Sequence, residues 1–161
     1  AESDAANSGG GNKWRGSMTN DPVNGNILSL YKLGAGGAMG TALGLPNILS
    51  KPLPKEVCEI EELNSLWVVG LDISSVPAEL GNLANLKTLK LNNNNLKELP
   101  EEIGKLENLE KLMINNNKLT KFPDAIVNCK SLKSISAKGN KIPQSEVARI
   151  TRALPKCKVK L

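Results

Sequence analysis

The chain contains no histidine among its 161 residues. This absence excludes Ser-His-Asp and Cys-His catalysis and every metal site that needs an imidazole ligand. Three cysteines, Cys58, Cys129 and Cys157, lie far apart in the sequence without a C-x-x-C pair. This pattern favours a reducing compartment over a disulfide framework, and it offers no zinc site. We therefore expect neither a metal nor a catalytic centre.

Aromatic residues are also scarce, at 2% of the chain against 40% for all hydrophobic residues. Leu, Ile and Val must therefore build the core, and few side chains remain for stacking on RNA bases. Long unbroken apolar runs are missing too. Residues 33–49 are apolar but rich in glycine and interrupted by Pro46, so we do not expect a membrane span, and membrane contact through small residues is the weaker alternative.

The glycines of this stretch, Gly34, Gly36 and Gly40, do not have the G-x-G-x-x-G spacing of a dinucleotide-binding loop. No βαβ unit follows them either, because a different periodic pattern begins soon after. The chain is therefore not expected to bind a nucleotide, and no cofactor is predicted.

Charge is distributed unevenly along the chain. The net charge is +5, but residues 45–129 carry nine basic and twelve acidic side chains, whereas residues 130–161 carry nine basic side chains against Glu146 alone. The cationic end predicts one of two things. It is either a solvated cap whose lysines keep an edge strand from pairing, or a surface for an acidic partner.

A repeat of 23 residues runs through most of the chain. Within one repeat, Leu89 and Leu91 alternate as a strand would, and Ile103, Leu106 and Leu109 then recur at helical spacing. One such unit cannot bury its own apolar side, so we expect the units to stack. The positions that repeat in register are Leu63, Leu86, Leu109 and Leu132, then Leu66, Leu89, Leu112 and Ile135, then Val68, Leu91, Ile114 and Ala137.

Asparagines cluster in "LKLNNNNLKELP" and "LMINNNKLTKFP". Asn94, Asn117 and Asn140 share one repeat position, where the chain turns inward after the strand. The Asn amide both donates and accepts hydrogen bonds, so it can pair turn backbone groups that no strand ladder reaches. We therefore predict a structural asparagine ladder. Leu71 replaces Asn in the first full repeat, where an apolar contact must substitute.

These residues resemble the leucine-rich repeat family, and the pattern LxxLxLxxNxLxxLPxxIGxL is best kept in residues 86–106. The form "LPxxIGxLxxL" is similar to that of the intracellular, Ras-group-related type. The resemblance implies an α/β solenoid with parallel strands on its concave side and short helices or 3₁₀ turns on its convex side. It covers a degraded repeat at 45–62, repeats at 63–85, 86–108, 109–131 and 132–142, and a C-terminal cap at 143–161.

Residues 1–44 show no period that would form a core, so we expect an extended, non-globular arm before the repeat domain of residues 45–161. Such an arm becomes ordered most readily against another subunit. Its candidate anchors are Trp14, Leu28 and Tyr31.

The concave face offers the other candidate surface. Its outward strand position reads Trp67, Lys90, Met113 and Ser136 in successive repeats. An exposed Trp on a strand is unusual, and Trp is enriched among binding hot spots. The alternative is that Trp67 is covered by the N-terminal arm or packs on Val69. The candidate partner-binding residues of this face are Trp67, Val69, Lys90, Lys111, Met113 and Lys138.

The resemblance implies a protein-interaction module without catalytic activity. We expect a structural or assembly subunit of a larger intracellular complex, which binds protein subunits through the arm and the concave face. The alternatives are a ribonucleoprotein component whose basic end contacts RNA phosphates and a regulator of a small GTPase. The expected location is a reducing compartment, either the cytoplasm or, after removal of a presequence, a plastid or mitochondrion.

Overall fold

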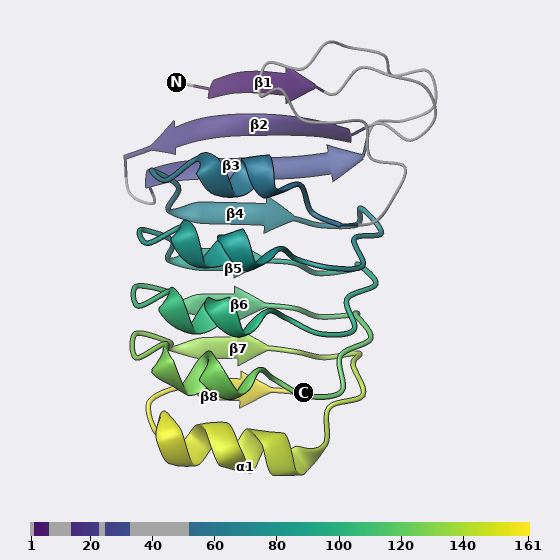
Figure 1. Cartoon of the computed structure of the whole chain (residues 1–161), viewed down its shortest axis with the longest axis vertical. Coiled ribbons are helices and arrows are strands. Elements are labelled where there is room, and N and C mark those ends of the chain that lie inside the picture. Colours follow the sequence, from purple (N-terminus) through teal and green to yellow (C-terminus); the bar gives the residue numbers. More distant parts are fainter. Residues whose placement is uncertain (1, 7–13, 23–24, 33–51) are drawn as a thin grey trace.

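Each repeat folds into a short strand followed by a 3₁₀ turn, and the units stack in chain order (Figure 1). The computed structural model describes residues 2–6, 14–22, 25–32 and 52–161. Within the repeats, the strands are β4 (Ser65–Val68), β5 (Thr88–Lys90), β6 (Lys111–Met113) and β7 (Ser134–Ser136). The 3₁₀ helices are η1 (Lys55–Glu59), η2 (Ala78–Asn82), η3 (Glu101–Lys105) and η4 (Asp124–Asn128).

The register of the parallel strands follows the 23-residue period. Leu66 lies beside Leu89, which lies beside Leu112, which in turn lies beside Ile135. Because equivalent residues of successive repeats pair, every inward leucine meets the same neighbour in the next layer. The predicted α/β solenoid of parallel strands and short 3₁₀ turns is confirmed.

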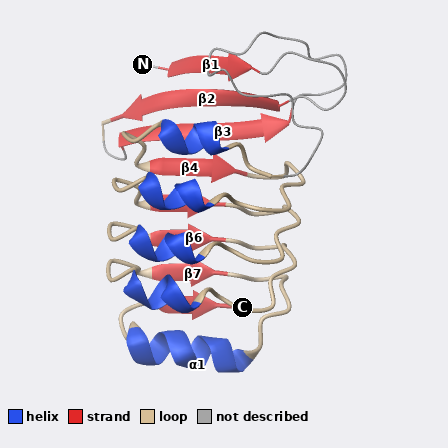
Figure 2. Ribbon diagram, viewed as in Figure 1, coloured by secondary structure: helices blue, strands red, loops and turns tan. Residues whose placement is uncertain are grey.

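A proline precedes each 3₁₀ helix: Pro54, Pro77, Pro100 and Pro123 are the N-cap residues of η1 to η4. Proline suits this position because its φ is fixed and the first turn needs no donor from it. The 3₁₀ helices lie over one face of the sheet, as the blue ribbons of Figure 2 show. The core fills the space between these two layers. Leu89, Leu91 and Ile103 are fully buried in it.

The N-terminal strands extend this sheet. Strands β1 (Glu2–Ala6), β2 (Trp14–Asp21) and β3 (Gly25–Lys32) pair antiparallel, and β3 pairs parallel with β4. The expectation of a non-globular arm over residues 1–44 is therefore wrong for these strands. Leu28 and Leu30 align with Leu66 and Val68 and are buried in the same core, so β3 covers apolar surface that β4 would otherwise expose.

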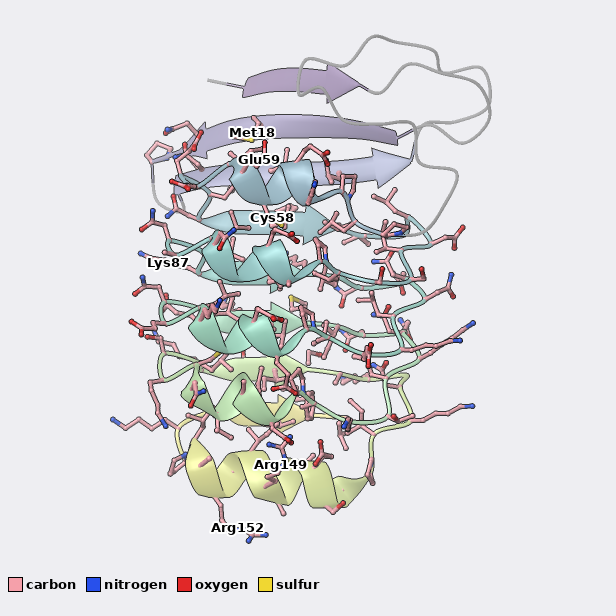
Figure 3. The ribbon with its side chains drawn as sticks, in the orientation of Figure 1. Met18, Cys58, Glu59, Lys87, Arg149 and Arg152 are labelled. Carbon is pink, nitrogen blue, oxygen red and sulfur yellow. The ribbon has the colours of Figure 1, made fainter. Side chains whose placement is uncertain are left out.

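The C-terminal end closes the stack with helix α1 (Gln144–Ala153) and strand β8 (Lys158–Lys160), which pairs with β7. Ile150 is buried on the inner face of the helix, and Leu154, directly after the helix, is also buried. Glu146 accepts hydrogen bonds from the Phe122 backbone N–H at 2.8 Å and from Arg149, which lies between η4 and α1 in Figure 3. No helix among the described residues has the length and apolar character needed to cross a membrane.

Candidate binding surfaces of the sheet

The asparagine ladder is made of side chains that bond backbone groups of two successive repeats. The Asn94 carboxamide accepts hydrogen bonds from the N–H groups of Leu71 and Ile73 at 3.0 and 3.1 Å. Its Nδ2 donates to the carbonyls of Val68 and Leu91 at 2.7 and 3.0 Å. Leu71 occupies the position that Asn94 has in the next repeat, and its partly buried side chain packs against the core. The ladder thus fastens each turn to the one before it.

Asn117 and Asn140 repeat this pattern one and two layers further along. Asn117 accepts from the Leu96 N–H at 3.1 Å and Asn140 accepts from the Leu119 N–H at 3.0 Å. Asn117 Nδ2 donates to the Leu91 and Ile114 carbonyls, and Asn140 Nδ2 to those of Ile114 and Ala137. These side chains hold the fold together, so they are not available to a partner.

Asn92, Asn93 and Asn95, the other asparagines of the "NNNN" tract, make different contacts from Asn94. The Asn92 carboxamide oxygen accepts from the Asn115 N–H at 2.8 Å, and Asn95 bonds Asp72 at 3.3 Å. Asn93 has a left-handed backbone with φ 60°, which Asn tolerates better than most residues. The same position carries Gly70, Asn116 and Gly139, also with positive φ. Asn92, Asn93 and Asn94 therefore have structural positions, and Asn95 adds one hydrogen bond at the surface.

The sheet face that no 3₁₀ helix covers is called the open face here, and it corresponds to the predicted concave side. Trp67 is half-buried on this face, beside Ser29 of β3 and Lys90 of β5. The Lys90 ammonium lies 4.0 Å from the centroid of the Trp67 ring, within the range of a cation–π contact. The indole Nε1 is buried and has no hydrogen-bond partner in the described part of the chain.

The remaining predicted residues of this face are spread around Trp67. Lys90 lies between Trp67 and half-buried Met113, so the two apolar side chains do not form one continuous stripe. Val69 is 36% exposed just beyond β4. Lys111 and Lys138 are exposed, and the Lys138 N–H donates to Asn115 at 2.8 Å.

The predicted partner-binding residues of the N-terminal region are Trp14, Leu28 and Tyr31. Leu28 was predicted to contact a partner, and this prediction is wrong because its side chain is fully buried in the core of the same chain. Trp14 and Tyr31 belong to strands β2 and β3, but their side chains lie outside the described residues.

The cysteines are buried and unpaired. Burial raises the pKa of both Cys58 and Cys129 to about 12, so neither is a thiolate near neutral pH. Cys129 also donates its thiol to the Ile103 carbonyl at 3.1 Å. Among the described residues no group of His, Cys, Asp or Glu side chains could hold a metal ion.

Sequence reasoning missed a second set of polar residues, at the side of the stack where the chain enters the strands. Asn85 and Asn108 donate to the carbonyls of Glu61 and Ala84, and Asn64 accepts from the Asn26 N–H at 2.9 Å. The 23-residue spacing of Asn85 and Asn108 is the signal that could have revealed them. On the same side, Lys133 and Glu110 form an ion pair of 2.6 Å.

Comparisons with known proteins agree with this geometry. The family description "Leucine-rich repeat region" matches residues 76–154. A leucine-rich repeat protein of Leptospira interrogans has a solved structure with 39% sequence identity and a TM-score of 0.66; the match covers 69% of this chain and 28% of that one. The chain thus spans little more than a quarter of that protein.

A second solved structure is that of the plant peptide hormone receptor RGFR1 in complex with RGF2, with 21% identity and a TM-score of 0.37; the match covers 69% of this chain and 26% of the receptor. A likeness this low carries no argument about function. No curated protein sequence matches the chain.

Proposed function

Because the chain belongs to the leucine-rich repeat family, whose fold is typically a non-catalytic interaction module, we propose that it is a structural or assembly subunit of a larger complex. Its open face is the proposed contact surface for protein partners. The Ras-group-related type remains a prediction. So does the reducing compartment, whether cytoplasm or organelle, with which the three free thiols agree.

The observation that carries the proposal is Trp67 on the open face. Parallel sheets are usually covered on both faces, whereas in the described part of this chain the 3₁₀ helices lie over one face only (Figure 2). On the open face, a half-buried indole with an unpaired Nε1 donor is bordered by Lys90. Because that Nε1 atom is buried, a partner gains instead from contact with the accessible part of the indole ring, which offers the apolar area typical of binding hot spots.

The test is the native mass of the full chain in gentle extracts of its source, compared with that of the Trp67→Ala variant. We expect the wild type to migrate in a large, nuclease-resistant complex. The variant should lose about 2 kcal/mol or more of binding free energy and migrate as the free chain. Lys97→Ala is the matched control, because Lys97 is exposed in a turn away from the open face. An unchanged complex with Trp67→Ala contradicts the proposal, provided that thermal melting shows both variants folded.

The second candidate is a ribonucleoprotein component, favoured only by the nine basic residues against one acidic residue in 130–161. A large complex that collapses on nuclease treatment would support it. The small-GTPase regulator rests on family resemblance alone, and no contact in the structure favours it.

A further inference from the structure

A groove runs along the side of the stack where the chain enters strands β5 to β7. Two adjoining hollows form it, and they share Lys87, Glu110 and Lys133. Figure 3 places Lys87 at this side of the stack, just before the start of β5. Lys87, Glu110, Lys133 and Lys156 are spaced by 23 residues, so each comes from a successive layer. We call this feature the entry groove.

The entry groove is strongly cationic. Its charged lining residues are five lysines and one glutamate: Lys87, Lys111, Lys130, Lys133, Lys156 and Glu110. Like charges gathered in a hollow raise the local potential and attract groups of the opposite sign. Among the described lining residues, Glu110 is the one acidic side chain set against these lysines.

Glu110 balances only part of the charge. Its carboxylate pairs with the Lys133 ammonium at 2.6 Å, and the Lys133 side chain remains 70% exposed. This hydrogen bond, helped by the charges of Lys133, Lys87 and Lys111, lowers the pKa of Glu110 below the ordinary glutamate value. Among the described residues, the other four groove lysines form no ion pair. Their ammonium groups can therefore bind external anions.

The chemistry of the lining favours carboxylates on a polypeptide over phosphates on RNA. Among the described residues no aromatic side chain lines the groove, so bases would find no stacking surface there. The neutral lining hydroxyls of Thr88 and Ser131 suit the amides of an extended backbone.

We propose that the entry groove binds an extended acidic segment of a protein partner, with the groove lysines pairing its Asp and Glu side chains. Neighbouring layers lie roughly 5 Å apart, so an extended chain that crosses them passes several lysines within a few residues. Ser65, Thr88 and Lys111 lie at outward strand positions where the groove adjoins the open face, and the other groove residues differ from those of that face. It is therefore a second contact surface, separate from the one around Trp67.

The test uses the full chain and a fluorescein-labelled peptide of alternating Glu and Ser, with binding followed by fluorescence anisotropy at low salt. We expect Lys87→Glu combined with Lys133→Glu to weaken binding about tenfold or more. The matched control combines Lys118→Glu with Lys141→Glu, two exposed lysines at equivalent positions of successive repeats that follow the strands rather than precede them. Equal losses in the two double variants, or no binding by the wild type, would overturn the proposal.

Glu110→Gln gives a test in the opposite direction. Removing this carboxylate frees Lys133 and adds one positive charge to the groove, so peptide affinity should rise about threefold. A loss of affinity would contradict the proposal, and a merely structural role for Glu110 cannot produce the gain. Labelled oligouridylate is the competing probe, and tighter binding of it than of the peptide would also reject the proposal.

Trp67→Ala separates this inference from the proposed function. The variant should keep the wild-type affinity for the acidic peptide, because Trp67 does not line the groove. A large loss with Trp67→Ala would place the acidic segment on the open face and overturn the groove assignment.

Discussion

Asn117 illustrates how single side chains hold the stack together. It is 7% exposed, and its carboxamide joins backbone groups of two repeats that no strand pairing reaches. Both ends of the amide are used, so neither Asp nor Leu could replace it without leaving a buried group unpaired. Asn94 has the same environment one layer earlier.

Asn117→Ala should therefore lower the free energy of unfolding by about 3 kcal/mol, because each buried group left without a partner costs about 1–3 kcal/mol. Urea denaturation measures this loss. Asn95→Ala is the control, since Asn95 makes one longer bond of 3.3 Å at the surface and should cost less than about 1 kcal/mol. Similar losses for the two variants would contradict the ladder's role.

At the residue scale, part of this was readable from the sequence. Asn94, Asn117 and Asn140 share one repeat position, which predicts a common role. Stacked units of the same geometry leave the same backbone N–H and C=O groups to be hydrogen-bonded. The left-handed backbone of Asn93 could not be foreseen in the same way. Asn occurs in many conformations, and only the turn geometry selects this one.

At the scale of elements, strand β3 makes the N-terminal region part of the sheet and its core, where a non-globular arm was expected. Its inward residues Leu28 and Leu30 continue the apolar layer of Leu66 and Val68, while Ser29 lies beside Trp67. The start of β3 is also fixed: Gly25 has φ 77°, and a Cβ there would collide with the side-chain oxygen of Asn64. Only glycine fits that approach without displacing Asn64.

Leu28→Ala should destabilise the protein by about 2–5 kcal/mol, as expected for a large-to-small change in a closed core. The neighbouring Ser29→Ala is the control, because Ser29 is half-buried on the opposite face of the same strand and should change stability by less than about 0.5 kcal/mol. Thermal and urea unfolding provide the comparison. A neutral Leu28→Ala would mean that β3 does not belong to the core.

At the scale of the whole molecule, the protein is a quasi-one-dimensional stack. Each layer contacts chiefly its neighbours, so the terminal layers are expected to open more readily than the middle ones. The three cysteines lie in different layers, so the reactivity of each thiol measures how readily its layer opens. Cys58 lies in η1, Cys129 directly follows η4, and Cys157 immediately precedes β8 at the C-terminal edge.

Alkylation near pH 8 should therefore modify Cys157 first and Cys129 much later, as followed by peptide mass spectrometry. All three thiols are buried, and burial raises the pKa of Cys129 to about 12 and that of Cys157 above its ordinary value. Urea-unfolded protein, in which the three should react alike, is the control. Equal rates under native conditions would instead show that the stack opens as one unit.

The same thiols predict a pH dependence of stability. A folded-state pKa near 12 for Cys58 and Cys129 exceeds the ordinary value of 9.0, so the folded state holds these protons more tightly than the unfolded chain. The stabilisation that these two protonated thiols give to the folded state is fully present below pH 9.0. It is lost as the pH rises toward 12.

The sequence by itself determined the solenoid, the strand register, the asparagine ladder and the absence of histidine-based chemistry. All of these follow from residue types and a 23-residue spacing, because a repeat needs only its nearest neighbours to define its fold. Only the tertiary structure decided that Leu28 is core, that Lys90 covers Trp67, and that lysines from successive layers line one groove around Glu110. These three features depend on side chains from different layers that contact one another. The 23-residue period predicts which residues are equivalent, but it does not predict which surfaces another part of the chain covers.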